Sequence, residues 1–342
     1  MPDRKRLTLK DIAKELGISV STASRALNSY AGISDETIKL VKEFAEKHNY
    51  VPNTMAVNFR KNKTMTVGMI VPELVHYFFS SVISGAISTA KKHNYSILVS
   101  QTDEKLKNEV FAIRTMLSSS VDGLLISVSN ETINGEYLQE ILDEGRPVVQ
   151  FDKVLDEMNT PKVIVDDFQG AYDGVRHLIQ EGYSKIAHIN GLQHVKNSQE
   201  RLRGYQKALL DHGIEESESW VLHCQQISED EGFAFAKELM TSENPPDAIF
   251  CITDLVAMGV MKYLKQAKIK IPKEVGVIGF SNWDMANFVS PSLSSIDQYA
   301  YQMGEKAMEL LVEAIKNNEV GKNQIHEIIP RLVVRESSKR LS

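Results

Sequence analysis

Cysteine is scarce in this chain. Of its 342 residues, only Cys224 and Cys251 are cysteines. Two cysteines are too few for a disulfide framework, and their spacing matches no zinc-binding pattern. We therefore expect both to be small buried side chains. The nine histidines are scattered without metal-ligand spacing, so the sequence predicts no metal site.

Long apolar runs are also missing. No stretch approaches the roughly 18 apolar residues that a membrane-spanning helix requires. The first six residues, Met-Pro-Asp-Arg-Lys-Arg, lack the apolar core of a signal peptide. The sequence therefore predicts a cytoplasmic protein with no membrane partner.

The motifs of the common phosphate-binding, nucleotide-binding and hydrolytic enzymes do not occur. The chain has no Gly-x-x-x-x-Gly-Lys-Ser/Thr, no strand-linked Gly-x-Gly-x-x-Gly, no Gly-x-Ser-x-Gly and no His-Glu-x-x-His. We therefore expect no catalytic residues, no cofactor and no enzymatic activity.

What is present is the composition of an ordinary globular protein with an uneven charge. Hydrophobic residues make up 42% and charged residues 25% of the chain. Residues 1–63 hold 12 Lys and Arg against 7 Asp and Glu, whereas the remainder holds 27 against 38. A basic head on an acidic body is typical of a protein that meets phosphate at one end, although a basic segment is also often just a solvated surface.

The N-terminal segment predicts three short helices. Thr8, Ser19 and Ser34 each precede an amphipathic run and are good helix N-caps, and Gly17 ends the first helix. The first two helices are separated by only three residues, which is the spacing of a helix-turn-helix. We expect the three helices to share one small core.

The second helix exposes the side chains that a DNA-reading helix needs. Val20 and Ser21 are short groups at its start, and Arg25, one turn later, can grip guanine bidentately. Taken alone, these residues are also compatible with an ordinary polar surface helix that does not bind DNA.

The run at residues 8–28 is Thr-Leu-Lys-Asp-Ile-Ala-Lys-Glu-Leu-Gly-Ile-Ser-Val-Ser-Thr-Ala-Ser-Arg-Ala-Leu-Asn. It closely resembles the start of the lactose/galactose repressor (LacI/GalR) family. The resemblance implies that Val20, Ser21 and Arg25 read bases. It further implies that phosphates are contacted by Thr8, Thr22, Ser24, Asn28, Ser34 and Thr37.

Residues 52–64 correspond to the hinge of that family, which forms a helix on DNA and pairs with a second copy in the minor groove. By resemblance, Met55 and Ala56 face the partner and Phe59 is the apolar wedge that parts a base step. The wedge is more often Leu, and Val57 replaces a residue that is often Arg. The alternative that Phe59 packs onto the body stays open.

From residue 65 onward, short apolar strands alternate with amphipathic helices, which predicts two doubly wound parallel-sheet lobes. The expected strands are Val67–Val71, Ile97–Ser100, Gly123–Ser127, Val148–Phe151, Lys185–Asn190, Ala248–Ile252 and Val275–Ser281.

The resemblance extends through Val-Asp-Gly-Leu-Leu-Ile at 121–126, Arg-Leu-Arg-Gly-Tyr at 201–205, Thr-Asp-Leu-Val-Ala-Met-Gly at 253–259 and Pro-Ser-Leu-Ser-Ser-Ile at 291–296. It implies a body of periplasmic-binding-protein type whose chain crosses between the lobes three times, near Thr160, Ser292 and Gln324. We therefore expect a headpiece at 1–51, a hinge at 52–64 and a body at 65–342. The first lobe would hold residues 65–160 and 293–324, and the second 161–292 and 325–342.

Ligands of such sheets bind beyond the carboxyl ends of the strands, here in the cleft between the lobes. Phe78 is also a candidate core residue and Asp254 a candidate helix N-cap. Ser281 stands where many sugar-sensing relatives carry Asp. The residues that we expect to bind an effector are Tyr77, Phe78, Asp152, Asn197, Arg201, Asp254, Ser281, Asn282 and Trp283.

These observations predict a transcriptional regulator, expected to be a repressor. It would bind a palindromic DNA operator as a homodimer, under the control of a small effector for which a sugar or sugar derivative is favoured. The alternative keeps the DNA-binding role but replaces the small molecule by a protein corepressor. More remote alternatives are a ligand-binding protein without DNA and an enzyme.

Overall fold

The computed structural model describes residues 7–30, 32–48, 50 and 63–340. The chain divides into two compact units, residues 1–64 and 65–342. No helix in the described part is long and apolar enough to cross a membrane. The predicted hinge residues Met55, Ala56 and Phe59 lie outside the described residues, so the hinge helix stays a prediction.

The headpiece consists of three helices that begin where the sequence predicts. They are α1 (Leu9–Glu15), α2 (Val20–Leu27) and α3 (Asp35–Lys47). Thr8 and Asp11 form a reciprocal capping box, while Ser19 and Ser34 accept hydrogen bonds from backbone N–H groups in the first turns of their helices. The helices close a small core around Ile12, Ala26, Val41 and Ala45.

The first lobe of the body contains a six-stranded parallel sheet in the order β11-β5-β4-β3-β1-β2. Its strands are β1 (Thr66–Val71), β2 (Ser96–Gln101), β3 (Leu124–Ile126), β4 (Val148–Phe151), β5 (Lys162–Val165) and β11 (Ile325–Ile328). Its helices are α5 (Tyr77–Lys92), α6 (Leu106–Ser118), α7 (Glu136–Asp143) and α12 (Ala300–Asn317).

The second lobe has a second six-stranded sheet, in the order β12-β10-β9-β8-β6-β7, in which β12 alone runs antiparallel to its neighbour. Its strands are β6 (Ile186–Asn190), β7 (Val221–His223), β8 (Ala248–Cys251), β9 (Gly276–Phe280), β10 (Ser294–Asp297) and β12 (Arg331–Val333). Its helices are α8 (Asp167–Gln180), α9 (Lys196–Asp211), α10 (Glu229–Thr241) and α11 (Asp254–Gln266), with short 3-10 turns η1 (Glu218–Trp220) and η2 (Asp284–Asn287).

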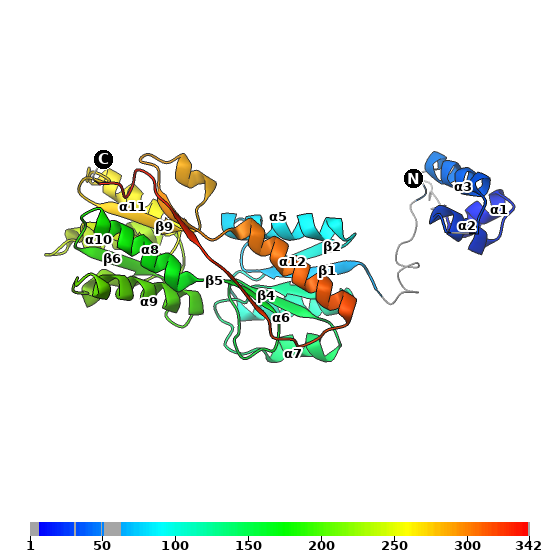
Figure 1. The fold of residues 1–342 in the computed structure, drawn as a ribbon, viewed down its shortest axis with the longest axis horizontal. Helices are drawn as coiled ribbons and strands as arrows, with labels where there is room; N and C mark the ends of the chain where they lie inside the picture. The colour runs from blue at the N-terminus through cyan, green and yellow to red at the C-terminus, as the bar shows by residue number, and fades with distance from the viewer. Residues whose placement is uncertain (1–6, 31, 49, 51–62, 341–342) are drawn as a thin grey trace. The chain divides into compact units, whose positions relative to one another are not determined.

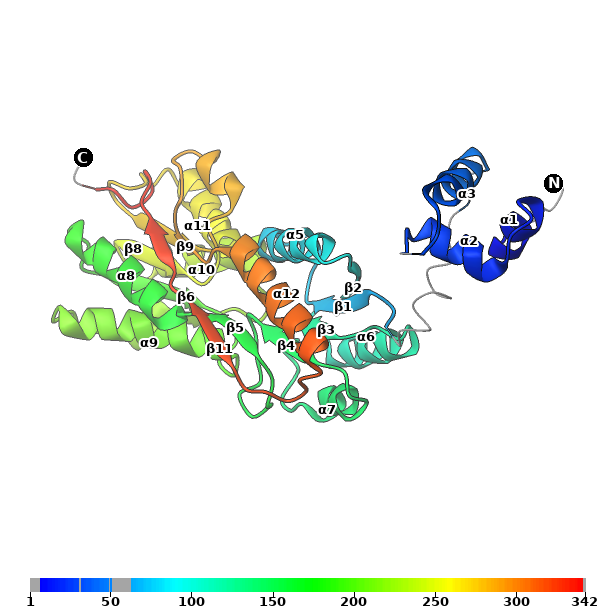
Figure 2. The same ribbon diagram turned by 45° about the vertical axis from the view of Figure 1, so that its right-hand side comes forward.

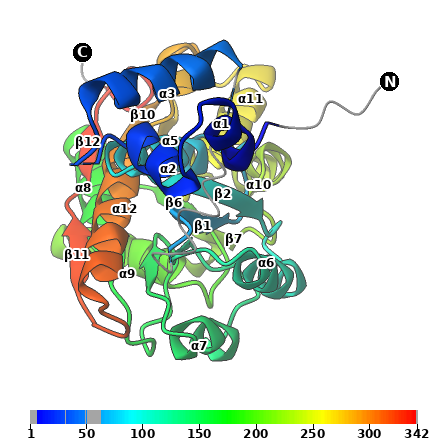
Figure 3. The ribbon, with the colours of Figure 1, turned by 90° about the vertical axis from the view of Figure 1, so that its right-hand side faces the viewer.

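Helices cover both faces of each sheet, so each lobe has two cores. In the first lobe, α5 and α12 pack on one face and α6 and α7 on the other (Figures 1 and 3). In the second lobe, α8 and α9 cover one face and α10 and α11 the other (Figure 2). All seven predicted strands are present, and the predicted α/β class with two parallel-sheet lobes is confirmed.

The chain passes between the lobes three times, in each case a few residues after the predicted position. Lys162–Val165 was assigned to the second lobe and pairs instead with β4 in the first, so the first passage follows Val165 rather than Thr160. The second follows Asp297 rather than Ser292, because β10 pairs with β9. The third follows Ile328 rather than Gln324, because β11 pairs with β5. Each boundary strand has only four residues, and periodicity does not reveal which sheet such a strand joins.

Candidate DNA-binding headpiece and effector pocket

The outward side of α2 carries the predicted base-reading residues. Val20 is 43% exposed, and Ser21 and Arg25 are also exposed. Ala23 and Ala26 on the opposite side are fully buried, so packing fixes which side of the helix faces outward. The start of α2 therefore presents short side chains followed by one guanidinium.

Four of the six predicted phosphate contacts lie at the N-terminal ends of the three helices. Thr8 and Ser34 are the caps of α1 and α3, and Thr22 and Thr37 stand in the first turns of α2 and α3. Helix N-termini carry unpaired N–H groups and a positive dipole end, which favour phosphate. The other two, Ser24 and Asn28, lie further along α2, where the Asn28 side chain donates to the Ser24 carbonyl oxygen at 2.8 Å.

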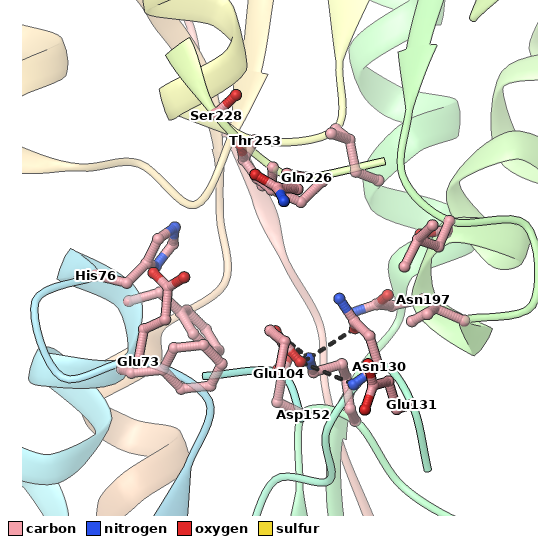
Figure 4. A pocket seen from close by; sticks show the side chains of 18 of the residues that line it. Glu73, His76, Glu104, Asn130, Glu131, Asp152, Asn197, Gln226, Ser228 and Thr253 are labelled. Carbon is pink, nitrogen blue, oxygen red and sulfur yellow. Dashed lines mark hydrogen bonds and ion pairs between the residues drawn. The ribbon is translucent and has the colours of Figure 1, made fainter. Parts of the chain in front are cut away.

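In the body, a cavity of about 930 Å³ lies between the lobes at the carboxyl ends of their strands. Figure 4 shows Glu73 and His76 on one side of it, Asp152 and Glu104 on another, and Gln226, Ser228 and Thr253 facing them. Phe78 and Phe79 add aromatic surface, although Phe78 also belongs to the first-lobe core. The cavity combines a few apolar side chains with many hydrogen-bonding groups, as sites for polar small molecules do.

Five of the nine residues predicted to bind an effector line this cavity: Phe78, Asp152, Asn197, Arg201 and Ser281. The other four, Tyr77, Asp254, Asn282 and Trp283, do not. That these four residues contact the effector stays a prediction.

Asp254 and Asn282 hold a loop rather than face the cavity. The fully buried Asp254 carboxylate accepts hydrogen bonds from the Ser295 hydroxyl at 2.5 Å and the Trp283 backbone N–H at 2.7 Å. The Asn282 side chain donates to Asp297 and accepts from Arg335. Because these polar groups already have partners, they stabilise the loop that follows β9.

That loop carries Trp283 against the other lobe. The Trp283 ring meets the ring of His76 edge-on at 4.9 Å and lies 6.3 Å from the ring of Tyr77, measured between centroids. His76 itself lines the cavity. Trp283 therefore contacts a lining residue, and its contacts with His76 and Tyr77 join the two lobes.

Arg201 is the buried cation of the second-lobe wall. Its Nε donates to Asp167 Oδ1 at 2.8 Å, its Nη1 donates to the Ile252 carbonyl oxygen at 2.6 Å, and its guanidinium lies 3.6 Å from the centroid of the Phe280 ring. Burial raises the pKa of Asp167, and the neighbouring Arg201 opposes that rise. A guanidinium has more N–H groups than these partners use, so Arg201 can still donate to a ligand.

Lys153 is the buried cation of the first-lobe wall, with a side chain that is 9% exposed. Its ammonium donates to both Glu104 carboxylate oxygens, at 2.5 and 2.6 Å, and to Asn130 Oδ1 at 2.9 Å (Figure 4). Three acceptors match the three N–H groups of an ammonium. Lys153 therefore positions Glu104 and Asn130 without a donor left for a ligand.

Two titratable side chains of the cavity, Asp152 and His76, have strongly shifted pKa values. Burial raises the pKa of Asp152 to about 6, against the opposing charge of Lys153. Burial, aided by Lys153, lowers the pKa of His76 to about 4, so His76 is neutral near pH 7. Asp152 receives a hydrogen bond from Ser127 at 3.3 Å. The cavity thus holds both a proton-sensitive carboxylate and an uncharged imidazole.

A buried carboxylate positions the loop that carries Asn130. Glu109, on α6, is fully buried and accepts from the Ser129 backbone N–H at 2.5 Å and the Thr132 hydroxyl at 2.9 Å. Across the cleft, His194 Nε2 lies 2.7 Å from the Asn130 carbonyl oxygen, which joins the second lobe to this loop. A second link is the ion pair between Lys196 and Asp156 at 2.6 Å.

Several lining residues were missed, although the sequence carried a signal for them. Asp103 and Glu104 follow β2, Asn130 and Glu131 follow β3, and Lys153 follows β4. All stand just beyond strand ends, so the rule that identified Asp152 applies to them equally. Within the described residues, no group of three or more His, Cys, Asp or Glu side chains could hold a metal ion.

Two family models match this chain. One, described as periplasmic binding proteins and sugar binding domain of LacI family, matches residues 64–333. The other, described as bacterial regulatory proteins, lacI family, matches residues 8–53. Together they cover the headpiece and almost the whole body.

Known proteins align with the chain from end to end. The HTH-type transcriptional repressor PurR of Vibrio campbellii is 32% identical over 98% of this chain and 99% of that protein. Catabolite control protein A of Priestia megaterium is 30% identical over 97% of this chain and 99% of that protein. These relatives are regulators of transcription, which confirms the prediction that the protein is not an enzyme.

Solved structures agree with this assignment. A complex of the transcriptional regulator CelR with cellobiose has 27% sequence identity and a TM-score of 0.73, over 97% of this chain and 100% of that chain. The lac repressor dimer bound to operator has 22% identity and a TM-score of 0.86 over 98% of this chain and 99% of that chain, which shows a shared fold. With both family models matched and full-length relatives at 30% identity and above, the chain belongs to the LacI family of bacterial regulatory proteins and is a DNA-binding transcriptional repressor.

Proposed function

We propose that this repressor binds a palindromic operator as a homodimer and that a small polyhydroxylated effector in the inter-lobe cavity controls its affinity for DNA. The observation that carries the proposal is the cavity itself, whose walls come from two lobes joined by three chain passages. A ligand that contacts both walls changes the balance between lobe arrangements, provided that it binds one arrangement more tightly.

The headpiece supports the DNA-reading half of the proposal. Val20, Ser21 and Arg25 are exposed on one helix, and four of the proposed phosphate contacts stand at helix N-termini. Short side chains at the start of a helix, followed one turn later by an arginine, fit the major groove. In the proposal, the paired hinges with Met55, Ala56 and Phe59 enter the minor groove.

An apolar area on the first lobe supports dimerisation. Leu98 and Val99 on the edge strand β2 are 41% and 36% exposed, and Ile87 on the neighbouring helix α5 is 47% exposed. An exposed edge strand with apolar side chains tends to associate with another protein surface, which shields it from water. A second copy of the chain would provide that cover and bring a second headpiece to the other half-site.

The chemistry of the cavity favours a small polar molecule as the effector over a protein corepressor. Amide, hydroxyl and carboxylate groups surround it together with Phe78 and Phe79. Aromatic faces and dense hydrogen-bonding groups suit a sugar, and cellobiose is the ligand named for the similar CelR complex.

Operator selection from random duplex DNA with the full-length protein, with and without a panel of sugars, tests the proposal. We expect one palindromic site to be enriched and one sugar class to change its enrichment. Enrichment that no sugar alters would favour a protein corepressor. Failure of the headpiece joined to its hinge to select any site would contradict the base-reading role.

Arg25 provides a sharper test of DNA reading. Arg25→Ala should cost about 1–3 kcal/mol at one base pair of each half-site, because a bidentate contact to guanine is lost. The measurement is competition binding between the selected operator and single-base variants of it. Replacing the exposed Lys237, in the body, is the control. Equal losses of Arg25→Ala on selected and random DNA would show that Arg25 contacts phosphate only.

A further inference from the structure

We propose that the effector is a sugar bearing an ammonium group and that the cavity rejects phosphorylated and carboxylated sugars. This inference rests on the proposed function, since it names the chemical class of ligand for the same cavity. It follows from how the charged side chains of the wall are paired.

The cations of the first-lobe wall are already neutralised. Lys105 forms an ion pair with Glu131 at 2.9 Å, and Lys153 is held by Glu104 and Asn130. All four charged side chains line the cavity. A phosphate or carboxylate ligand would have to displace a carboxylate from one of these pairs, and it would meet repulsion from that carboxylate as it did so.

The cation of the second-lobe wall is neutralised too. Arg201 and its partner Asp167 are both largely buried, with side-chain exposures of 4% and 11%. In that pair the guanidinium acts as a hydrogen-bond donor whose charge is balanced. It therefore suits a hydroxyl oxygen better than an anion.

Three lining carboxylates have no ion-pair partner in the described part of the chain: Glu73, Asp103 and Asp152. Amide side chains of Gln101 and Asn108 donate to Asp103, and the Ser127 hydroxyl donates to Asp152. Burial and the neighbouring Glu104 and Asp103 raise the pKa of Glu73. An ammonium group beside them would relieve this repulsion.

His76, which also lines the cavity, does not offset this negative charge. His76 is neutral near pH 7, because its pKa is lowered to about 4. The second-lobe wall opposite supplies neutral hydrogen-bonding groups from Asn197, Gln226, Ser228 and Thr253. These groups can bind the hydroxyls of neutral, cationic and anionic sugars alike. Discrimination by charge therefore depends on the first lobe.

Calorimetric titration of the full-length protein with matched sugars tests this inference. Each series holds a parent sugar (glucose, galactose, mannose or cellobiose), its amino-sugar form and its acid form, with the 6-phosphate added for the monosaccharides. Within the series that binds, we expect the amino sugar to bind about tenfold tighter than its parent and the anionic members to bind more weakly than the parent. A phosphate or acid that binds more tightly than its parent would overturn the inference.

Two single substitutions move the preference in opposite directions. Glu73→Gln removes an unpaired carboxylate and should shrink the advantage of the amino sugar several-fold. Glu131→Gln leaves Lys105 without its carboxylate partner and should raise the affinity for the anionic members. Lys105 and Glu131 side chains are 60% and 48% exposed, so the fold should tolerate this change. Glu238→Gln removes one exposed carboxylate outside the cavity and should leave the preference unchanged.

The outcomes separate this inference from the proposed function. If no sugar of any series binds while the protein still selects an operator, the ligand class is wrong and the repressor function stands. If sugars bind without discrimination by charge, the effector cavity stands and the charge argument fails.

Discussion

The two walls of the cavity are built from different chemistry. The described first-lobe wall holds all five lining carboxylates, on Glu73, Asp103, Glu104, Glu131 and Asp152. The second-lobe wall holds amides, hydroxyls and Arg201, whose charge Asp167 balances. The first wall is therefore suited to discriminate ligands by charge, and the second to bind hydroxyls by geometry. An effector that touches both walls is recognised by two independent properties.

The largest effect should come from the cation of the second wall. Arg201→Ala leaves the Asp167 carboxylate buried without its partner, which should lower the free energy of unfolding by about 3 kcal/mol. Urea unfolding followed by circular dichroism measures this loss. Restoring stability in the double variant Arg201→Met with Asp167→Leu would confirm that the unpaired charge is the cause. A single variant as stable as the parent protein would show that the pair is not buried in solution.

The next largest effect should be a pH dependence of ligand binding that arises from the first wall and not from the second. The pKa of Asp152 is raised to about 6, so acidification through that value protonates a carboxylate of the first wall. We expect amino-sugar affinity to fall about tenfold between about pH 7.5 and about pH 5, because the cation then loses an anionic neighbour.

Asp152→Asn is the matched control for this pH dependence, because Asn tolerates the left-handed backbone of residue 152, whose φ is 58°. The variant should bind weakly at both pH values. Because the folded-state pKa lies above the ordinary aspartate value of 3.8, protonation of Asp152 should also stabilise the fold as the pH falls from about 6 towards 4. If Asp152→Asn keeps the pH dependence, a group other than Asp152 causes it.

A smaller and uniform effect is expected from the second wall. Asn197→Ala removes a half-buried amide that faces the cavity and should weaken every member of a sugar series alike, by about 1 kcal/mol or fivefold. Calorimetry on the matched series measures it. If only the neutral, only the amino or only the anionic sugars lost affinity, the second wall would also discriminate by charge, which would contradict the proposed difference between the walls.

The smallest effect should come from an ion pair that joins the two lobes at the surface. Lys196 and Asp156 are 41% and 62% exposed, so water screens their attraction. Lys196→Ala should change the free energy of unfolding and the sugar affinity by less than about 0.5 kcal/mol. A larger change in sugar affinity than in stability would show that this pair biases the arrangement of the lobes.

The headpiece could be predicted residue by residue because its signals are local. A cap, its partner three residues later and an apolar face all lie within one helix, as Thr8 and Asp11 illustrate. The seven predicted strands were equally visible as apolar runs. The passages between lobes were not, because the sheet that each of β5, β10 and β11 joins depends on strand pairing, which a four-residue run does not reveal.

The cavity could be predicted in position but only partly in composition. Asp152 and Asp254 both stand near strand ends and look alike in sequence. Only the tertiary structure shows that the Asp254 carboxylate accepts hydrogen bonds from Ser295 and Trp283, whereas Asp152 lines the cavity. The ion pairs that set the charge of the wall, such as Lys153 with Glu104, join residues 49 positions apart and cannot be read from spacing.

The two units of this chain also differ in when they can form during synthesis. The headpiece closes its core with residues up to Tyr50, whereas the two sheets of the body are completed only by β11 and β12, near residue 330. At ribosomal speed the intervening residues take roughly 15 to 60 s to synthesise. A nascent chain therefore carries the DNA-reading unit long before it has a sensor. A chain that ends between them would contain the whole headpiece core but neither complete sheet of the sensor.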